Sequence, residues 1–376
     1  MGSEDLPSWI GADARTKFEQ ARHLAAEHLP PIAAGGAAGR VNRPLIRALG
    51  EAGILPQIFP GDGAVASAVT LCLLREGLAG GSTEAETAFA LQGLGSYPIV
   101  LAGSAELRER WIPHIAYGEA VAGFALTEPD AGTDVAALSL SADKVDGGYR
   151  LSGTKKWISN APDADVYSLF ARTSDAGARG ITAFVVPGGV QGMTGRSLEL
   201  LAPHAIGTLE LDGVFVADDQ ILGKVDGGFG LAMRTLDLFR PSVGAGAVGM
   251  AQAALDAALA YAETRTSMGK PLREFQAVSH QLAEAAARTK AARLLVYDAA
   301  TIYDAGERVT KAAAIAKLFA TETAQWVIDV ALQIHGASGL EKGHLLEHLY
   351  RDVRATRIYE GTSEIQREII ARELSR

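Results

Sequence analysis

The pattern of apolar and polar positions divides the chain into three successive stretches. Residues 1–121 show helical periodicity, with Ala- and Leu-rich segments at 14–27, 45–52 and 107–115 between Gly and Pro residues. From 122 to 224, short β-rich runs at 149–152, 166–172 and 181–186 alternate with Asp-Gly, Gly-Gly and Pro-Gly turns. From 225 to 376 long helical patterns return, at 243–264, 276–305, 309–335 and 363–374. The order predicts a multidomain α+β protein whose middle β domain lies between two helical domains.

Composition narrows the class of protein. With 376 residues, 48% of them hydrophobic, the chain can bury large cores. A net charge of -9 disfavours a phosphate backbone as partner, so we expect no nucleic-acid binding. The single cysteine, Cys72, lies in an apolar run and offers neither a disulfide framework nor a cysteine metal cluster. We expect a buried thiol and no metal site.

The chain start and the apolar runs bear on location. The first nine residues, MGSEDLPSW, are partly acidic and lack an apolar core, so they resemble neither a secretory signal nor an arginine-rich transit peptide. Charged or amide residues interrupt the long apolar stretches before the roughly 20 residues that a membrane span needs. We therefore expect a cytoplasmic protein without a membrane span.

Residues 244–249, GAGAVG, match the spelling of a dinucleotide-binding motif. Such a motif should follow a strand and be answered about 20 residues later by an acidic residue that closes a second strand. Here Phe239-Arg240-Pro241 precedes it and a helical pattern follows. The small residues are better explained by close packing between helices, because Gly has no Cβ to keep the backbones apart.

The segment 124–134, FALTEPDAGTD, places a short strand before a turn rich in Pro, Asp and Gly. Backbone N–H groups in such a turn, with the hydroxyls of Thr127 and Thr133, could hold a polar ring or a phosphate. Alone, the same pattern is also typical of a solvent-facing loop.

This segment resembles the first signature of the acyl-CoA dehydrogenase family, and GTKKWISN at 153–160 follows at the distance of that family's next motif. The resemblance runs from end to end of the chain. It implies a β-barrel-like middle domain, a C-terminal four-helix bundle and FAD as cofactor. It also implies that these two segments supply cofactor-binding residues, namely Phe124, Leu126, Thr127, Gly132, Thr133, Trp157 and Ser159, with Thr133 also near the substrate.

Two later segments complete the resemblance. RTSMGKPL at 265–272 and QIHGASG at 333–339 are similar to motifs that, in the family, reach the FAD of a neighbouring subunit. Met268 stands where an aromatic residue is usual, and Ala337 and Gly343 also depart from the pattern. The resemblance implies a homotetramer, a dimer of dimers, with further cofactor contacts from Arg265, Ser267, Met268, Gln276, Gln333, Gly336 and Ala337.

The segment 359–366, YEGTSEIQ, carries the candidate base. Ser363 and Gln366 have the spacing of a capping box, which predicts a helix after Ser363 and leaves Glu360 on the preceding turn. An exposed acidic residue near a helix start is the alternative for Glu360 taken alone. The resemblance makes Glu360 the catalytic base. It places Gly361, Asp237 and Arg240 near the substrate and Thr362 and Glu364 near the cofactor. Phe239 stands where other branches of the family carry their base.

The resemblance implies FAD-dependent α,β-dehydrogenation of an acyl thioester. Glu360 would remove the α-proton, the β-hydride would pass to the flavin, and the electrons would go to an electron-transferring flavoprotein. An acyl-CoA is the default substrate, and an acyl-carrier-protein thioester is a second candidate. The alternatives are an acyl-thioester oxidase or flavin monooxygenase on the same fold, or a non-catalytic FAD- and acyl-binding assembly factor.

Overall fold

The computed structural model describes residues 3–61, 67–202 and 204–375. Contacts divide the chain into two compact units, each assembled from segments that are distant in sequence. The bundle unit contains Met1–Pro30, Ser67–Glu86 and Asp237–Arg376, and the sheet unit contains Pro31–Ala66 and Thr87–Leu236. The domain boundaries at residues 121 and 224 stay a prediction.

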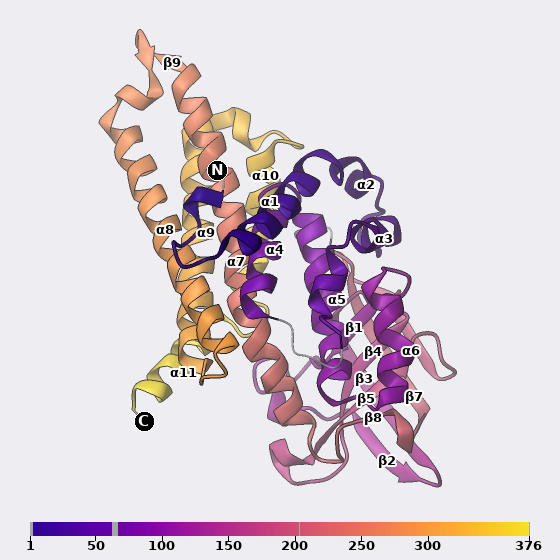
Figure 1. Ribbon diagram of the computed structural model, residues 1–376. Coiled ribbons are helices and arrows are strands. Elements are labelled where there is room, and N and C mark those ends of the chain that lie inside the picture. The colour runs from indigo at the N-terminus through magenta and orange to yellow at the C-terminus, as the bar shows by residue number, and fades with distance from the viewer. Residues whose placement is uncertain (1–2, 62–66, 203, 376) are drawn as a thin grey trace. The chain divides into compact units, whose positions relative to one another are not determined.

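The bundle unit is helical throughout apart from one small hairpin. From residue 237 onward the described chain forms three long helices and then two shorter ones, and the N-terminal helices pack beside them (Figure 1). The elements are the 3₁₀ turn Ser3–Asp5, α1 (Ala12–Glu27), α4 (Ala68–Ala79), the start of α5 (Thr83–Ala102), α7 (Gly228–Thr264) from Asp237 on, β9 (Thr266–Ser267), β10 (Lys270–Pro271), the 3₁₀ turn Leu272–Glu274, α8 (Gln276–Asp304), α9 (Thr310–His335), the 3₁₀ turn Gly336–Leu340, α10 (Leu345–Thr356) and α11 (Ser363–Leu374).

One hydrophobic core joins α7, α8, α9 and α10. Each of the four helices contributes fully buried residues, including Met250, Leu282, Val327 and Leu349. Burial of this shared apolar surface is the main force that holds such helices together. The predicted four-helix bundle is thus confirmed. Helix α11 packs on α9, and α4 packs on both α1 and α8.

The glycine-rich run of α7 allows close packing, as predicted. A Cβ on Gly249 would lie 2.4 Å from the Glu76 carbonyl oxygen, and one on Gly246 would lie 2.6 Å from Glu86 Oε1. Neither distance leaves room for a methyl group. The run lies inside one long helix and follows no strand, which excludes the dinucleotide-binding interpretation.

Two features of the bundle unit differ from the sequence prediction. Helix α7 begins at Gly228 and continues through Pro241, whereas the pattern predicted a start at residue 243.

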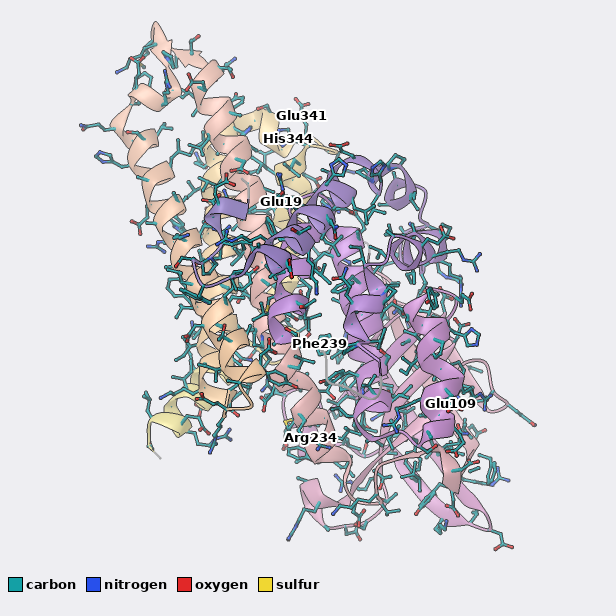
Figure 2. All side chains as sticks on the ribbon, in the orientation of Figure 1. Glu19, Glu109, Arg234, Phe239, Glu341 and His344 are labelled. Atoms are coloured by element: carbon teal, nitrogen blue, oxygen red, sulfur yellow. The ribbon has the colours of Figure 1, made fainter. Side chains whose placement is uncertain are left out.

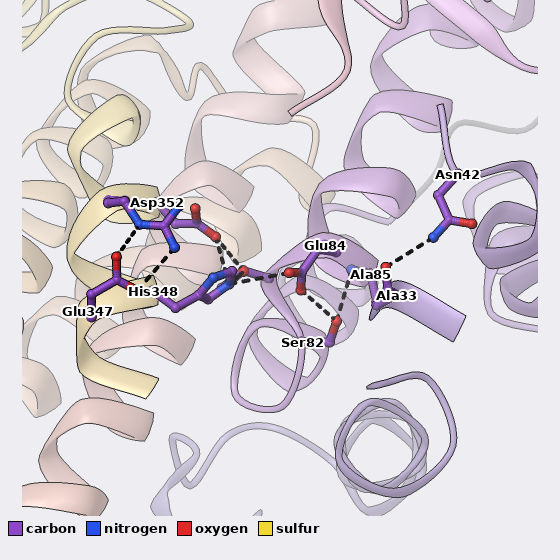
Figure 3. A network of polar contacts seen from close by, with 10 residues as sticks. Ala33, Asn42, Ser82, Glu84, Ala85, Glu347, His348 and Asp352 are labelled. Carbon is purple, nitrogen blue, oxygen red and sulfur yellow. Dashed lines mark hydrogen bonds and ion pairs between the residues drawn. The ribbon is translucent and has the colours of Figure 1, made fainter. Parts of the chain in front are cut away.

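Helix α10 was not predicted, because its apolar residues form only a narrow stripe in a charged sequence. Polar contacts fix α10 to the start of α5, where His348 Nε2 lies 3.4 Å from Glu84 Oε1 (Figure 3). Thr83 Oγ1 lies 2.7 Å from His348 Nε2 and also donates to Asp352. The Asp352 contact raises the pKa of His348.

The sheet unit combines one mixed sheet with helices. The strand order is β6-β7-β3-β2-β4-β5-β8, and β1 pairs in parallel with β4. The elements are α2 (Pro30–Ala34), α3 (Arg43–Glu51), the 3₁₀ turn Leu55–Ile58, the rest of α5, α6 (Ala105–Ala116), β1 (Ala122–Ala125), the 3₁₀ turn Val135–Ala137, β2 (Ser141–Val145), β3 (Gly148–Ser159), β4 (Val166–Arg172), the 3₁₀ turn Gly177–Gly180, β5 (Ile181–Pro187), β6 (Met193–Ser197), β7 (Ile206–Ala217), the 3₁₀ turn Asp218–Gln220 and β8 (Ile221–Leu222). The predicted middle β domain is confirmed.

A bulge in β3 determines how one predicted site residue is presented. Strand β3 pairs with β7, but the register shifts between Lys156 and Ile158. Trp157 lies in the shift with a φ of 57°, a left-handed conformation that is unusual for a bulky residue. A bulge leaves the extra residue unpaired and re-aims its side chain. Trp157 is accordingly 43% exposed, whereas its neighbour Ile158 is buried.

Within the described residues, one helix is long and apolar enough to cross a membrane by length and composition. It is α7, and 67% of its most apolar window is buried inside the protein. Burial of that extent is the pattern of a core helix.

Candidate active site

Glu360 lies on the short turn between α10 and α11, as predicted, but the cap of α11 differs. Glu360 has a φ of 54° and Gly361 a φ of 92°, so two successive residues are left-handed. Thr362 is the N-cap, and its Oγ1 accepts from the Ile365 N–H at 3.4 Å. The predicted capping box is wrong: the Ser363 hydroxyl donates to Glu322 instead. Glu364 is exposed in the first turn.

Three side chains donate to the carbonyl oxygens of the Glu360–Gly361 turn, and we call this arrangement the carbonyl clamp. Arg240 Nε donates to the Glu360 oxygen at 3.2 Å. Gln366 Nε2 donates to the Glu360 oxygen at 3.3 Å and to the Gly361 oxygen at 2.9 Å. Lys317 Nζ donates to the Gly361 oxygen at 2.8 Å. The donors come from α7, α11 and α9, so the strained turn is held from three helices.

The Glu360 carboxyl group itself accepts no hydrogen bond from the part of the chain that the structure describes. Glu360 is half-buried, but its Oε2 atom is shielded from solvent and makes no hydrogen bond to any described residue. Burial raises the pKa of this carboxyl, while the nearby charges of Arg75, Arg240 and Lys317 oppose the shift. A carboxyl with a raised pKa and an unused oxygen is suited to accept a proton.

A buried ion pair contributes to the field at Glu360. Arg75, from α4, donates to Glu86 at 2.6 Å and to the Ser242 hydroxyl at 2.8 Å. Both charged side chains are almost completely inaccessible to solvent. Burial works against the Arg75 charge, but Glu86, Tyr359 and Glu360 outweigh it and raise the pKa of the guanidinium. Arg75 therefore remains a permanent positive charge beside the turn.

Asp237 and Arg240 lie beside the same turn. Arg240 Nη1 forms an ion pair with Asp237 Oδ1 at 3.2 Å. Burial raises the pKa of the Asp237 carboxyl despite this arginine. Phe239, labelled in Figure 2, lies between these two residues in the sequence and is fully buried. Its side chain cannot act as a second base.

The two signature segments of the sheet unit meet each other. The Lys156 N–H donates to the Thr127 carbonyl at 3.0 Å, and Lys155 Nζ donates to the Leu126 carbonyl at 3.0 Å. Lys155 also forms a buried ion pair with Glu128 at 2.8 Å. The two signature segments, about 30 residues apart in the chain, are therefore held side by side by backbone hydrogen bonds and a buried ion pair.

The side chains at this junction fit a planar polar cofactor. Trp157 presents its indole outward, and the hydroxyls of Thr127, Thr133 and Ser159 have no hydrogen-bond partner among the described residues. Gly132 and Thr133 are exposed, Leu126 is buried, and Phe124 is half-buried against Phe170, with ring centroids 5.0 Å apart. Unpaired hydroxyls and a partly exposed indole are groups of the kind that can contact the ring of a flavin.

The other predicted cofactor residues lie at the far end of the bundle unit. His335 stacks on Tyr261 at 4.2 Å, which places the β9–β10 hairpin and the segment after α9 at one end. Along α7, that end is about 36 Å from Arg240. In Figure 2, His344, which packs against His335, lies well away from Phe239 along the bundle. The residues concerned, Arg265, Ser267, Met268, Gln276, Gln333, Gly336 and Ala337, are exposed and are not brought together with Glu360.

Sequence reasoning missed the residues that surround Glu360. Lys317 is a buried lysine within an Ala-rich helix, and Arg75 and Glu86 lie in apolar N-terminal helices. Gln366 was interpreted only as a helix cap. A charged residue in an otherwise apolar helical stretch is the signal that could have indicated the first three, because such residues are almost never buried unless paired.

Comparison with known proteins identifies the family. The models of the N-terminal, middle and C-terminal domains of acyl-CoA dehydrogenase match residues 12–119, 123–214 and 226–375. Cyclohexane-1-carbonyl-CoA dehydrogenase from Geobacter metallireducens is 35% identical over 369 residues, which is 96% of this chain and 97% of the relative. Together the three matches span most of the chain.

Solved structures agree with these matches. Butyryl-CoA dehydrogenase from Megasphaera elsdenii has a TM-score of 0.93 at 32% identity and covers 99% of this chain and 100% of its own. A chain in a structure described as the electron transferring flavoprotein of Acidaminococcus fermentans gives the same values. An FAD complex of PigA has a TM-score of 0.92 at 26% identity, over 98% and 99% of the two chains. The fold and the three domain matches are those of a flavin-dependent oxidoreductase. The chain belongs to the acyl-CoA dehydrogenase family, which uses FAD and acts on acyl-CoA.

Proposed function

We propose that the protein forms the α,β-double bond of an acyl-CoA thioester with Glu360 as the base that removes the α-proton. The observation that carries the proposal is the shielded Oε2 atom of Glu360, which has no partner among the described residues. A buried carboxylate in a structural role is normally hydrogen-bonded or paired.

The turn supplies a second group for the reaction. The N–H of Glu360 has no hydrogen-bond acceptor among the described residues. It can therefore donate to the thioester carbonyl as negative charge develops there, which makes the α-proton more acidic. The raised pKa of the Glu360 carboxyl brings it nearer to the pKa of that proton. The carbonyl clamp fixes both groups with respect to each other.

Bound FAD supplies the two-electron acceptor for the β-hydrogen. Phe124, Leu126, Thr127, Gly132, Thr133, Trp157 and Ser159 would hold its ring through the unpaired hydroxyls and the indole. Asp237, Arg240, Gly361 and Thr133 would position the thioester, and Thr362 and Glu364 would contact the cofactor. These roles follow from the family resemblance, and the exposure of Gly132, Thr133 and Trp157 supports it.

The assembly and the electron acceptor are part of the same proposal. The hairpin with Arg265, Ser267, Met268 and Gln276, and the segment with Gln333, Gly336 and Ala337, would serve the FAD of a partner subunit in a homotetramer. Their separation from Glu360 within one copy supports this. The similarity to the structure described as an electron transferring flavoprotein supports such a protein as electron acceptor. We further propose a cytoplasmic enzyme without nucleic-acid partners.

Anaerobic mixing of the FAD-loaded protein with thioesters tests the proposal. Oxidation of the substrate should bleach the visible flavin absorbance. The panel should contain straight-chain and cyclic acyl-CoAs and their carrier-protein counterparts. Glu360→Gln should retain bound FAD and lower the bleaching rate by about 100- to 10,000-fold, the range for loss of a positioned base. Glu368→Gln, an exposed residue of α11, is the matched control and should bleach at the wild-type rate.

Other outcomes would assign a different function. Substrate-dependent oxygen consumption at the rate of turnover would indicate an oxidase or monooxygenase. Retention of FAD with no bleaching by any thioester would indicate a non-catalytic acyl-binding protein. Equal bleaching by the wild type and Glu360→Gln would exclude Glu360 as the base.

A further inference from the structure

Lys317 is an unusual member of the carbonyl clamp. Its side chain is fully buried in α9, and its ammonium group donates to the Gly361 carbonyl oxygen at 2.8 Å. No carboxylate among the described residues lies within ion-pair distance of it. An ammonium group has three protons to donate, and a buried charge without a paired partner is costly. A residue that only packs would not retain this charge.

The hydrogen bond alone does not explain a lysine. Gln366 Nε2 donates to the same Gly361 oxygen at 2.9 Å, so this acceptor is already satisfied by a neutral amide. What Lys317 adds is a positive charge at the turn that carries Glu360. We infer that Lys317 is a positioning residue for the proposed base, holding the left-handed turn and stabilising the ionised form of the Glu360 carboxyl.

The surrounding charges support this division of roles. Burial lowers the pKa of Lys317 to about 8, while Glu360, Glu322 and Glu364 favour its charged form and Arg240 disfavours it. From the other side, Lys317, Arg75 and Arg240 favour the ionised Glu360, and Glu86 disfavours it. Among these cations, the two arginines each have a carboxylate partner, Glu86 for Arg75 and Asp237 for Arg240. Of these three cations, Lys317 has no carboxylate ion-pair partner among the described residues, and its ammonium group donates to the turn instead.

The inference rests on the proposed function and predicts a specific change in pH dependence. A cation near a carboxyl lowers its pKa, so loss of the Lys317 charge should raise the pKa of Glu360. The acid limb of the kcat/KM profile reports the base of the free enzyme. In Lys317→Met this limb should move to higher pH, and kcat should fall more than KM rises. Lys317→Arg keeps a charge and should restore the limb toward its wild-type position.

The experiment compares wild type, Lys317→Met, Lys317→Arg and the control Lys311→Met with FAD bound. Lys311 lies exposed on the same helix, so its variant makes the same chemical change without touching the turn. Bleaching by wild type in the same assay tests the proposed function first. If wild type bleaches and Lys317→Met keeps both its acid limb and its kcat, the inference is overturned. A lower kcat with an unmoved acid limb also overturns it, since this indicates a purely structural effect.

A double-mutant cycle gives a readout without turnover. Lys317→Met should shift the urea midpoint differently in wild type and in Glu360→Gln, because the charge interaction exists only when both partners are present. Equal shifts in the two backgrounds would contradict the inference. If Lys317→Met does not fold, Lys317→Gln provides the neutral variant for both measurements.

Discussion

Two glutamates, one in each unit, show how opposite environments arise around the same side chain. In the sheet unit, the Glu128 carboxylate accepts from Lys155, from the N–H groups of Ser139 and Leu140, and from the Ser139 hydroxyl. In the bundle unit, Oε2 of Glu360 has no partner among the described residues, and the clamp donors go to backbone carbonyls instead. Both carboxylates are shielded, so burial alone does not separate them.

The difference lies in where the neighbouring donors point. Burial would raise the pKa of Glu128, but Lys155 and the backbone donors outweigh it and hold the pKa below its usual range. Near Glu360, the cations act from a distance and burial prevails, so the pKa is raised. A carboxylate saturated with donors is held in one state and stabilises the fold. A carboxylate without them can exchange a proton, which is what a base requires.

The largest expected effect is a loss of unfolding free energy when the Glu128 carboxylate is removed. Glu128→Gln leaves Lys155, which is fully inaccessible to solvent, without its carboxylate. Removing one partner of a buried pair typically costs about 3–5 kcal/mol. Urea unfolding followed by circular dichroism should show a loss of this size. Glu360→Gln should show no loss, because the carboxylate has no contact to lose among the described residues.

Two control variants test whether the loss in Glu128→Gln comes from the buried ion pair. Glu109→Gln changes an exposed glutamate of α6 and should alter the unfolding free energy by less than about 0.5 kcal/mol. The double variant Glu128→Gln and Lys155→Met removes both charges and should recover part of the loss. A stable Glu128→Gln protein would show that Lys155 can lose its proton cheaply, as its pKa of about 8 allows.

The sequence predicted the large elements because their patterns are strong. The long apolar helices α8 and α9 and the strands β4 and β5 have ends within about two residues of those predicted. Short amphipathic α10 was missed, since it is stabilised by packing and by contacts with Thr83 that lie far away in sequence. The start of α7 was also missed, because Pro241 argues locally for a break that tertiary packing overrides.

At the site, the sequence predicted the position of Glu360 but not its surroundings. The spacing of Ser363 and Gln366 predicts that Glu360 lies on a turn before a helix, and the structure has it there. The clamp depends on Lys317, Arg240 and Gln366, which come from three helices whose mutual packing no local pattern encodes. The capping box failed for a related reason: Ser363 met a better partner, Glu322, from another helix.

A smaller effect on stability is expected at two glycines, Gly361 next to Glu360 and Gly132 in the loop after Glu128. Gly361 has a φ of 92°, and an added Cβ would lie 2.7 Å from the Gln366 amide nitrogen of the clamp. Gly132 has an ordinary φ, and its nearest atom would be 4.0 Å away. Gly361→Ala should therefore destabilise the protein by about 1–2 kcal/mol and lower kcat, while Gly132→Ala should leave stability within about 0.5 kcal/mol. Equal unfolding free energies for the two variants would contradict the strain at Gly361.

The smallest effect is an opposite pH dependence of stability for the two glutamates. The folded pKa of Glu128 is below its unfolded value of 4.5, so its contribution is present above that pH and is lost as pH falls through the folded pKa. The folded pKa of Glu360 is above 4.5, so its contribution is present below that pH and is lost as pH rises through the folded pKa.

Unfolding free energies measured between about pH 4 and pH 7 check this sign, since one group changes stability by at most about 1.4 kcal/mol per pH unit. The unfolding free energy of wild type relative to Glu128→Gln should rise as pH rises, and that of wild type relative to Glu360→Gln should fall. Slopes of the same sign would mean that the Glu360 carboxyl gains a partner in solution. The turn would then hold a structural carboxylate, and the same finding would count against its role as the base.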